Sequence, residues 1–136
     1  MRIAFGTDED TPVTERIKAT LLAEGHDVDH VAPGARWAEV GEAVAQAVAD
    51  GEAERGIACC WTGTGVSIAA NKVRGVRAAL CTDAETARGA RRWNDANVLA
   101  LGLRLTSEEV AQEMVEAFLA TDADPDEREA IAAVEP

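Results

Sequence analysis

The sequence has no tyrosine, only two lysines and no surplus of basic charge. Its 13 Lys and Arg residues face 25 Asp and Glu residues, which gives a formal net charge of −12. A protein that binds nucleic-acid backbones needs clustered cations, so this balance argues against nucleic acid as a partner and disfavours anionic membrane surfaces. The acidic excess is typical of a solubilising surface.

Long hydrophobic runs are also missing. No stretch approaches the roughly 18 to 20 apolar residues of a membrane span, and the chain begins directly with a strand-like segment rather than a signal peptide. We therefore expect no membrane partner and a cytoplasmic location. With 47% apolar and 28% charged residues, residues 1–136 are expected to form one globular domain with an acidic, divergent tail at 121–136.

Cysteine is scarce, and the three present, Cys59, Cys60 and Cys81, are an odd number. A disulfide scaffold is therefore not expected. Neighbours on a strand point to opposite faces, so Cys59 and Cys60 suit neither a disulfide nor one metal ion. His26 and His30 are not at zinc-ligand spacing from them, and we expect neither a metal site nor an organic cofactor.

The pattern alternates short apolar segments with amphipathic ones. Strands are expected at 2–6, 27–31, 56–60, 76–81 and 98–101, and helices at 12–24, 37–50, 67–72, 83–93, 106–119 and, weakly, 127–134. Strict alternation favours an α/β fold, a three-layer, doubly wound, Rossmann-like parallel sheet of about five strands. Ligands of such sheets bind beyond the carboxyl ends of the strands. We expect three loops, 7–10, 61–65 and 93–97, to converge there.

The loop Thr62-Gly63-Thr64-Gly65 lies between a strand and a helix, where backbone amides can bind an anion. It is neither a dinucleotide fingerprint nor a Walker loop, and an ordinary tight turn explains the spacing as well. Cys60 ends the strand before it. A thiol beside a helix N-terminus can act as a base or nucleophile, although a small buried hydrophobe is the alternative for Cys60. Asp8 is positioned either to bind a sugar hydroxyl or to cap a helix.

The run from 51 to 104, with SIAANK at 67–72, RAAL at 77–80 and NDAN at 94–97, resembles the ribose-5-phosphate isomerase type B and galactose-6-phosphate isomerase family. The Gly-Thr-Asp opening at 6–8 resembles it too. The resemblance implies an aldose–ketose isomerase or epimerase that acts on a small sugar or sugar phosphate through an enediolate. It also implies a homodimer or homotetramer with the pocket at the subunit interface.

The family's functional residues fall on specific positions of this chain. The base of one branch falls on Cys60, whereas the glutamate base of the other branch falls on Val66, which cannot do this work. Thr62 matches the residue that contacts the ring oxygen. The remaining matches are the anion-binding amides of Gly63, Thr64 and Gly65, the hydroxyl ligands Asp8 and Asn94, and the pocket arginine Arg104.

The chain departs from the family pattern at four places. Trp93 replaces the histidine that helps open the sugar ring, Glu9 replaces a second histidine, and Trp61 replaces a glycine. The tail retains only Arg128 where the family has a cluster of phosphate-binding arginines. Fewer cations and one more carboxylate disfavour a dianionic phosphate, and the aromatics suit a sugar face.

Three interpretations of these changes stay open. The first is an isomerase with altered substrate choice, for an open-chain or phosphate-free sugar. The second is that Arg91, Arg92 or Arg128 replaces the phosphate clamp while Thr62 or a water opens the ring. The third, non-catalytic interpretation is an impaired sugar-binding or partner subunit of a related isomerase.

Overall fold

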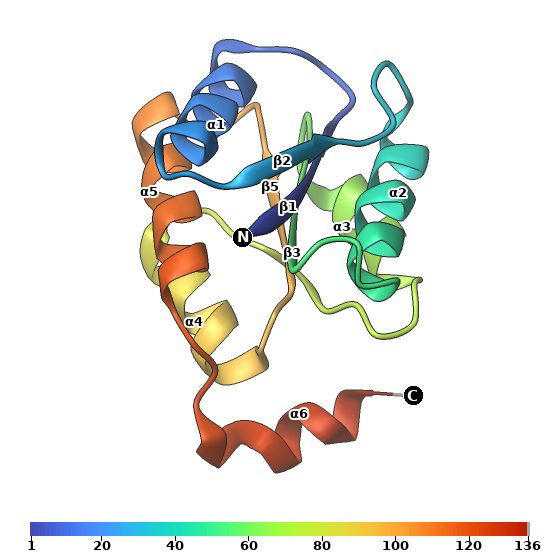
Figure 1. The fold of residues 1–136 in the computed structure, drawn as a ribbon, viewed down its shortest axis with the longest axis vertical. Helices are drawn as coiled ribbons and strands as arrows, with labels where there is room; N and C mark the ends of the chain where they lie inside the picture. The colour runs from blue at the N-terminus through green and yellow to red at the C-terminus, as the bar shows by residue number, and fades with distance from the viewer. Residues whose placement is uncertain (136) are drawn as a thin grey trace.

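A computed structural model describes residues 1–135 of the chain, and it contains one five-stranded, all-parallel sheet in the order β2-β1-β3-β5-β4. The strands are β1 (Arg2–Thr7), β2 (Asp27–His30), β3 (Arg55–Cys60), β4 (Ala78–Leu80) and β5 (Val98–Gly102). The helices are α1 (Pro12–Ala23), α2 (Trp37–Ala49), α3 (Thr64–Asn71), α4 (Ala84–Asn94), α5 (Glu108–Ala120), the 3-10 turn η1 (Pro125–Glu127) and α6 (Arg128–Val134). The expected α/β fold is confirmed (Figure 1).

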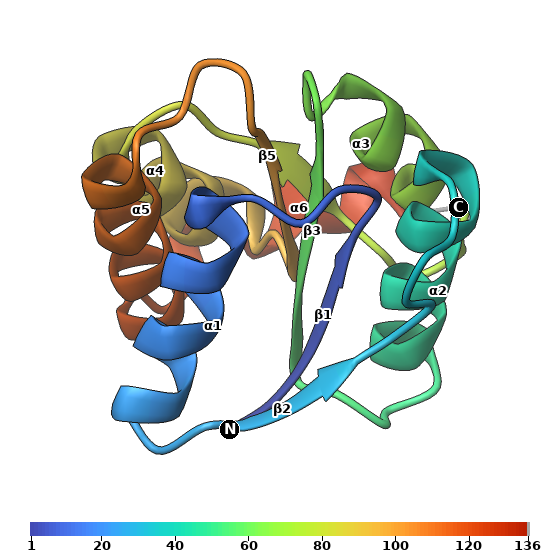
Figure 2. The same ribbon diagram turned by 90° about the horizontal axis from the view of Figure 1, so that it is seen from above.

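Helices cover both faces of the sheet. Figure 2 shows α1, α4 and α5 on one side and α2 with α3 on the other. Each side buries its own apolar cluster, since side chains alternate along every strand. Cys59 belongs to the cluster under α1, α4 and α5, and Cys60 to the cluster under α2 and α3. The expected opposite orientation of the two cysteines is therefore confirmed.

Local capping explains where several helices begin. Thr11 and Thr14 form a reciprocal capping box at the start of α1, and Pro12 fills the first turn, where no amide hydrogen is needed. The side chain of Asp83 accepts a hydrogen bond from the Thr86 amide at the start of α4. Ser107 does the same for α5 through the Val110 amide.

Two elements differ from the sequence prediction. α3 begins at Thr64 rather than at residue 67, because Gly63 caps it in a left-handed conformation. β4 is three residues long rather than six. Before it, the Arg77 amide bonds to the side chain of Asn97 and not to a strand backbone, so ladder pairing starts later than the apolar pattern indicates.

The expected convergence of three loops is wrong for one of them. β3 and β5 pair so that Gly56 faces Val98 and Cys60 faces Gly102, and the Gly56 amide donates to the carbonyl of Asn97. Residues 93–97 therefore lie at the amino edge of the sheet, four residues or roughly 13 Å along the strand from Cys60. Only loops 7–10 and 61–65 meet at the carboxyl edge.

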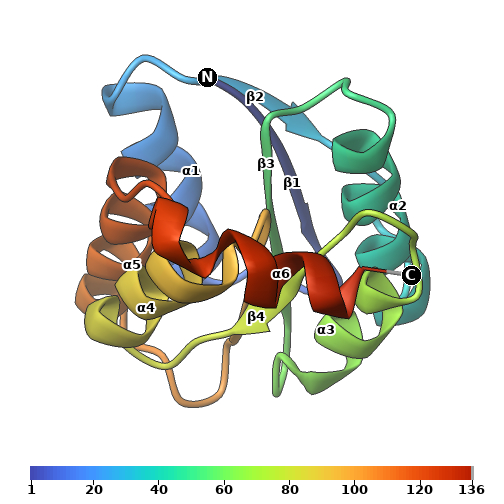
Figure 3. The same ribbon diagram turned by 90° about the horizontal axis from the view of Figure 1, so that it is seen from below.

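The acidic tail crosses the amino edge. Figures 1 and 3 show α6 lying across that end of the molecule, beyond the helical layers. Its start is tied down where the Asp124 amide donates to the carbonyl of Arg92 at 2.8 Å. Within residues 1–135, no helix is long and apolar enough to span a membrane.

Two helical glycines provide a test of the packing. A Cβ at Gly41 of α2 would lie 2.7 Å from the backbone oxygen of Val66, which cannot move without shifting α3. At Gly89 of α4 it would lie 2.8 Å from the ring of Trp93, an exposed side chain that can swing aside. We expect Gly41→Ala to lower the free energy of unfolding by about 1–3 kcal/mol.

Gly89→Ala is the matched variant, expected to be neutral or to stabilise by about 0.5–1 kcal/mol, since alanine is the better helix former. Urea denaturation of both variants and the wild type measures the difference. Equal effects of the two substitutions would contradict the close α2–α3 approach.

Candidate active site

The chain leaves the sheet toward opposite faces after β1 and after β3. After β1 the chain runs to α1 on one face, and after β3 it runs to α3 on the other, so the two loops part above adjacent strands (Figure 2). This is the topological switch point at which doubly wound sheets bind ligands. The Asp8 amide donates to the carbonyl of Cys59 at 3.3 Å, which places Asp8 beside the end of β3 and next to Cys60.

The glycine turn above Cys60 is packed so closely that its shape is fixed. Gly63 has φ +77°, and a Cβ there would lie 2.6 Å from Leu80 Cδ1 and 2.7 Å from the carbonyl carbon of Leu101. The carbonyl of Thr62 also packs closely against Gly102. A Cβ added at Gly102 would lie 2.6 Å from the Thr62 carbonyl oxygen. Side chains are therefore excluded on both sides of the contact.

The same turn presents hydrogen-bond donors at the carboxyl edge of the sheet. The first amides of α3 have no carbonyl partner within the helix, as at every helix start, and the helix dipole favours negative charge there. The hydroxyls of Thr62 and Thr64 lie 2.7 Å apart. A rigid turn with unpaired amides and two linked hydroxyls can bind a developing oxyanion and donate to it.

The three thiols have different surroundings. Burial raises the pKa of Cys59 far above its usual range, and the nearby Cys60 and Asp8 add to this. Burial, with a contribution from Asp83, raises the pKa of Cys81 to about 11. Neither supplies a thiolate near neutral pH. Cys60 is 4% exposed and ends β3, so among the three thiols it is the one next to the glycine turn.

Two carboxylates and one arginine lie at the carboxyl edge of the sheet, where Cys60 ends β3. Burial raises the pKa of Asp8, the charge of exposed Glu9 raises it further, and one oxygen of the Asp8 carboxylate is buried without a partner. That oxygen is available to a ligand hydroxyl. Arg104 lies at the same edge, because its amide donates to the carbonyl of Trp61 at 2.9 Å. Trp61 and Arg104 line a small adjoining pocket of about 200 Å³.

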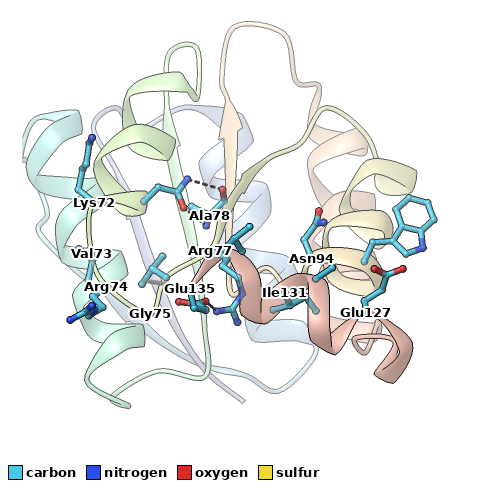
Figure 4. Close-up of a pocket in the computed structure, with 15 residues that line it drawn as sticks. Lys72, Val73, Arg74, Gly75, Arg77, Ala78, Asn94, Glu127, Ile131 and Glu135 are labelled. Carbon is cyan, nitrogen blue, oxygen red and sulfur yellow. Dashed lines mark hydrogen bonds and ion pairs between the residues drawn. The ribbon is translucent and has the colours of Figure 1, made fainter.

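Trp93 and Asn94 line a different and larger hollow. It is a groove of about 650 Å³ between the 71–78 segment and α6, at the amino edge of the sheet (Figure 4). Asn94 and α6 residue Ile131 lie on one side, and Lys72 and Arg74 come from the other (Figure 4). Within one chain, the groove does not contain Cys60, Asp8 or the glycine turn.

The three arginines considered as phosphate ligands differ in their burial. Arg91 is 2% exposed and donates to Asp95 and to the carbonyls of Ala96 and Thr121, so it has no free face for a phosphate. Arg91 is therefore excluded as the phosphate clamp, which leaves Arg92 and Arg128 of that alternative. Arg92 and Arg128 are exposed at the amino edge, where Arg128 opens α6.

Sequence reasoning missed two supports of these regions. The indole of Trp37 packs on the glycine turn, since a Cβ on Gly65 would lie 2.6 Å from its ring. Asp95 binds both Arg91 and Arg77, next to Asn94 in the chain. Trp37 carried a detectable signal, as a large aromatic opening a helix otherwise rich in small residues. The Arg91–Asp95 pair is also local, at i,i+4 spacing, whereas the bond from Arg77 comes from a residue distant in sequence.

The model for the Ribose/Galactose Isomerase family matches residues 3–134. The chain belongs to this family. Its named relatives place it among enzymes, the sugar-phosphate isomerases. Galactose-6-phosphate isomerase subunit LacB of Clostridium acetobutylicum is 39% identical over 88% of this chain and 72% of its own length. D-erythrulose-4-phosphate isomerase of Pectobacterium atrosepticum is 40% identical, and the match spans 73% of this chain but 65% of that protein.

Solved structures agree with the family's fold. Type B ribose 5-phosphate isomerase of Trypanosoma brucei superposes with a TM-score of 0.91 at 36% identity, covering 98% of this chain and 96% of that one. Ribose-5-phosphate isomerase B of Clostridium thermocellum gives a TM-score of 0.90, also at 36% identity, over 98% and 95% of the two chains. The Rossmann-like sheet and its helices are therefore those of this isomerase family.

The raised pKa of Asp8 makes a signed prediction for stability. Because the folded-state pKa exceeds the ordinary aspartate value of 3.8, folding becomes less favourable as the pH rises through the interval between the two values. Asp8→Asn should therefore raise the melting temperature at pH 7, and its advantage should shrink and vanish below about pH 3.8.

Asp83→Ala provides a control of opposite sign, since the hydrogen bond from the Thr86 amide lowers the pKa of Asp83. Asp83→Ala should lower the melting temperature at pH 7, and this decrease should be smaller in acid. Thermal unfolding of both variants from pH 3 to 8 measures this. A lower melting temperature for Asp8→Asn at pH 7 would contradict the assigned environment.

Proposed function

We propose that this chain is an aldose–ketose isomerase in which Cys60 is the base. The observation that carries the proposal is the position of Cys60 at the end of β3, between Asp8 and the N-terminus of α3. The site gathers the three groups that enolisation needs: a proton acceptor, donors for an oxyanion, and an acceptor for a substrate hydroxyl. Thr62 and Arg104 stand at the same edge.

In the proposed reaction, the Cys60 thiolate removes the proton from C2 of the open-chain aldose. The C–H electron pair forms the C1–C2 double bond of a cis-enediolate, and the carbonyl electrons move to O1. Amides of Gly63, Thr64 and Gly65 stabilise that negative charge. The thiol then returns its proton to C1 as O2 becomes the ketone. The linked hydroxyls of Thr62 and Thr64 carry the proton between the two oxygens, so no net redox change occurs.

The remaining predicted ligands complete this site only if two copies of the chain associate. Asp8, Glu9, Trp61, the glycine turn and Arg104 belong to the carboxyl edge, and Trp93, Asn94 and Arg128 to the amino edge. We propose a homodimer in which the groove of about 650 Å³ of one copy receives the catalytic edge of the other. Each active site then contains residues from both subunits.

We further propose that the preferred substrate is a four-carbon sugar with an anionic group on C4, which the exposed Arg92 and Arg128 of the amino edge would bind in place of the family's arginine cluster. Trp93 has an indole that donates a hydrogen bond but cannot shuttle protons near neutral pH, so ring opening lacks its usual acid. A tetrose whose C4 hydroxyl is replaced or phosphorylated cannot close a furanose ring. Relatives with such names include D-erythrulose-4-phosphate isomerase and 4-deoxy-4-sulfo-D-erythrose isomerase, the latter 35% identical over 89% of this chain.

The non-catalytic alternative also has one observation in its favour. A relative 39% identical is named as a subunit of galactose-6-phosphate isomerase. A partner subunit without chemistry of its own would bind a sugar yet exchange no proton with solvent. The presence of Cys60 beside a complete glycine turn favours the enzyme.

Proton transfer is tested by solvent deuterium incorporation into D-erythrulose 4-phosphate, followed by NMR. Removing a catalytic base costs about 10²–10⁴-fold, so Cys60→Ser should lose exchange by at least that lower figure. Cys59→Ala, on the opposite face of the same strand, should retain it within a few-fold. Equal exchange in wild type and Cys60→Ser would refute the assignment of the base.

Substrate choice is tested by comparing kcat/KM for D-erythrulose 4-phosphate, 4-deoxy-4-sulfo-D-erythrose and D-ribose 5-phosphate. The two four-carbon substrates should be preferred over the pentose phosphate, which is mostly cyclic. Trp93→His should raise kcat/KM for ribose 5-phosphate by about tenfold or more, by restoring an acid for ring opening, and should leave the tetroses unimproved. A wild-type preference for ribose 5-phosphate would contradict the open-chain proposal.

A further inference from the structure

Asp95 is the centre of an ionic cluster at the amino edge. Its Oδ1 accepts a hydrogen bond from Arg91 Nη1 at 2.7 Å, and its Oδ2 accepts one from Arg77 Nη2 at 3.3 Å. Its backbone carbonyl also accepts from Arg77 Nε at 2.9 Å. Two arginines from different elements therefore hold one aspartate by both its carboxylate and its backbone.

Arg91 makes this cluster rigid. Its guanidinium donates further bonds to the carbonyls of Ala96 at 2.7 Å and Thr121 at 3.0 Å, and it lies 5.8 Å from the centre of the Phe118 ring. A cation buried to this degree needs its partner, because an unpaired buried charge is strongly destabilising. The position of Asp95 relative to the core is thus set by both arginines, since Arg91 holds one carboxylate oxygen and Arg77 holds the other oxygen and the backbone carbonyl.

The cluster lies directly behind the two residues predicted to contact substrate. Asp95 ends α4 in a left-handed conformation with φ +47°, and Trp93 and Asn94 are the two residues immediately before it, exposed along the large groove. The direction of these side chains follows from where the last turn of α4 is anchored. Figure 4 shows Asn94 on the groove wall, with Arg77 beneath α6.

The same cluster also anchors the tail. Besides Asp95, Arg77 pairs with Glu135 just beyond the end of α6, and Arg91 holds the carbonyl of Thr121 where α5 ends. Both ends of the 121–135 segment are therefore tied to the arginines that hold Asp95. One set of contacts fixes the spacing between the Trp93–Asn94 turn and α6, which are the two walls of the groove.

We propose that Asp95, together with Arg91 and Arg77, is a positioning residue that fixes Trp93 and Asn94 of one copy for the reaction in the active site of the other. This rests on the proposed function, in which the groove of one subunit completes the site of its partner. Misplacing a substrate-contacting group by about 1 Å costs as much as 10²-fold in rate. A turn anchored by a buried arginine avoids that loss.

The direct test uses Arg77→Gln, which removes two bonds from Asp95 and the ion pair with Glu135 but leaves the buried Arg91–Asp95 pair intact, so that the fold is retained. Arg88→Gln is the matched control. Like Arg77, Arg88 is an ion-paired arginine, but its partner is Glu85 within α4 and it lies outside the Asp95 cluster. Amide order parameters from ¹⁵N relaxation of the ligand-free protein report the anchoring.

We expect the order parameters of Trp93 and Asn94 to fall from about 0.85 to below about 0.6 in Arg77→Gln and to stay unchanged in Arg88→Gln. Unchanged values in Arg77→Gln would overturn the proposal. This measurement does not depend on activity, so it tests the anchoring of the turn even if the chain acts on none of the sugars tried.

The functional test uses a purified heterodimer of Arg77→Gln and Cys60→Ser chains carrying different affinity tags. The Arg77→Gln homodimer should lose about 10–10²-fold in kcat on D-erythrulose 4-phosphate, with a smaller change in KM. The heterodimer has one site with an intact Cys60 facing an intact cluster, so it should regain about half the wild-type activity. A heterodimer no more active than the Arg77→Gln homodimer would show that the cluster acts within its own chain and would overturn the proposal.

The two hypotheses fail in different ways. If the Cys60→Ser homodimer is as active as wild type, the proposed base is wrong while the order parameters still test the anchoring. If Cys60→Ser is inactive and the heterodimer is not rescued, the base stands and the positioning role falls.

Discussion

The parallel pairing of β3 with β5 is the contact on which the rest of the structure depends. It sets Cys60 beside Gly102, and this lets the turn at Gly63 pack directly over the end of β5. It also sets Gly56 beside Val98, which carries residues 93–97 to the opposite edge. One edge of a parallel sheet holds only one end of each strand, so the predicted site residues fall into two groups at opposite edges of the sheet.

Much of the fold was predictable because its signals are local. The capping box at Thr11, the aspartate cap at Asp83 and the alternation of Cys59 and Cys60 each depend on residues within a few positions of one another. The residues of the carboxyl edge were predictable for the same reason, since the turn follows a strand directly. The short β4 was not, because Asn97, distant in sequence, takes the amide of Arg77.

The amino edge shows where sequence reasoning fails. A segment that precedes a strand lies at its amino end, so topology alone argues against 93–97 meeting Cys60. Arg91 was one of three arginines considered as a phosphate clamp. Its pair with Asp95 is local, but its burial also depends on Phe118 and Thr121, contacts that only the packed structure brings together. The packing of Trp37 on Gly65 is long-range in the same sense.

The central claim, that an active site is built from opposite edges of two copies, is tested most directly by a crystal structure of the protein in its solution assembly. The account predicts an interface in which Cys60 of one copy and Asn94 of the partner subunit lie within about 10 Å, close enough to line one small-molecule pocket. A monomer in solution, or an assembly whose interfaces leave every Cys60 edge open to solvent and far from every Asn94, would contradict it.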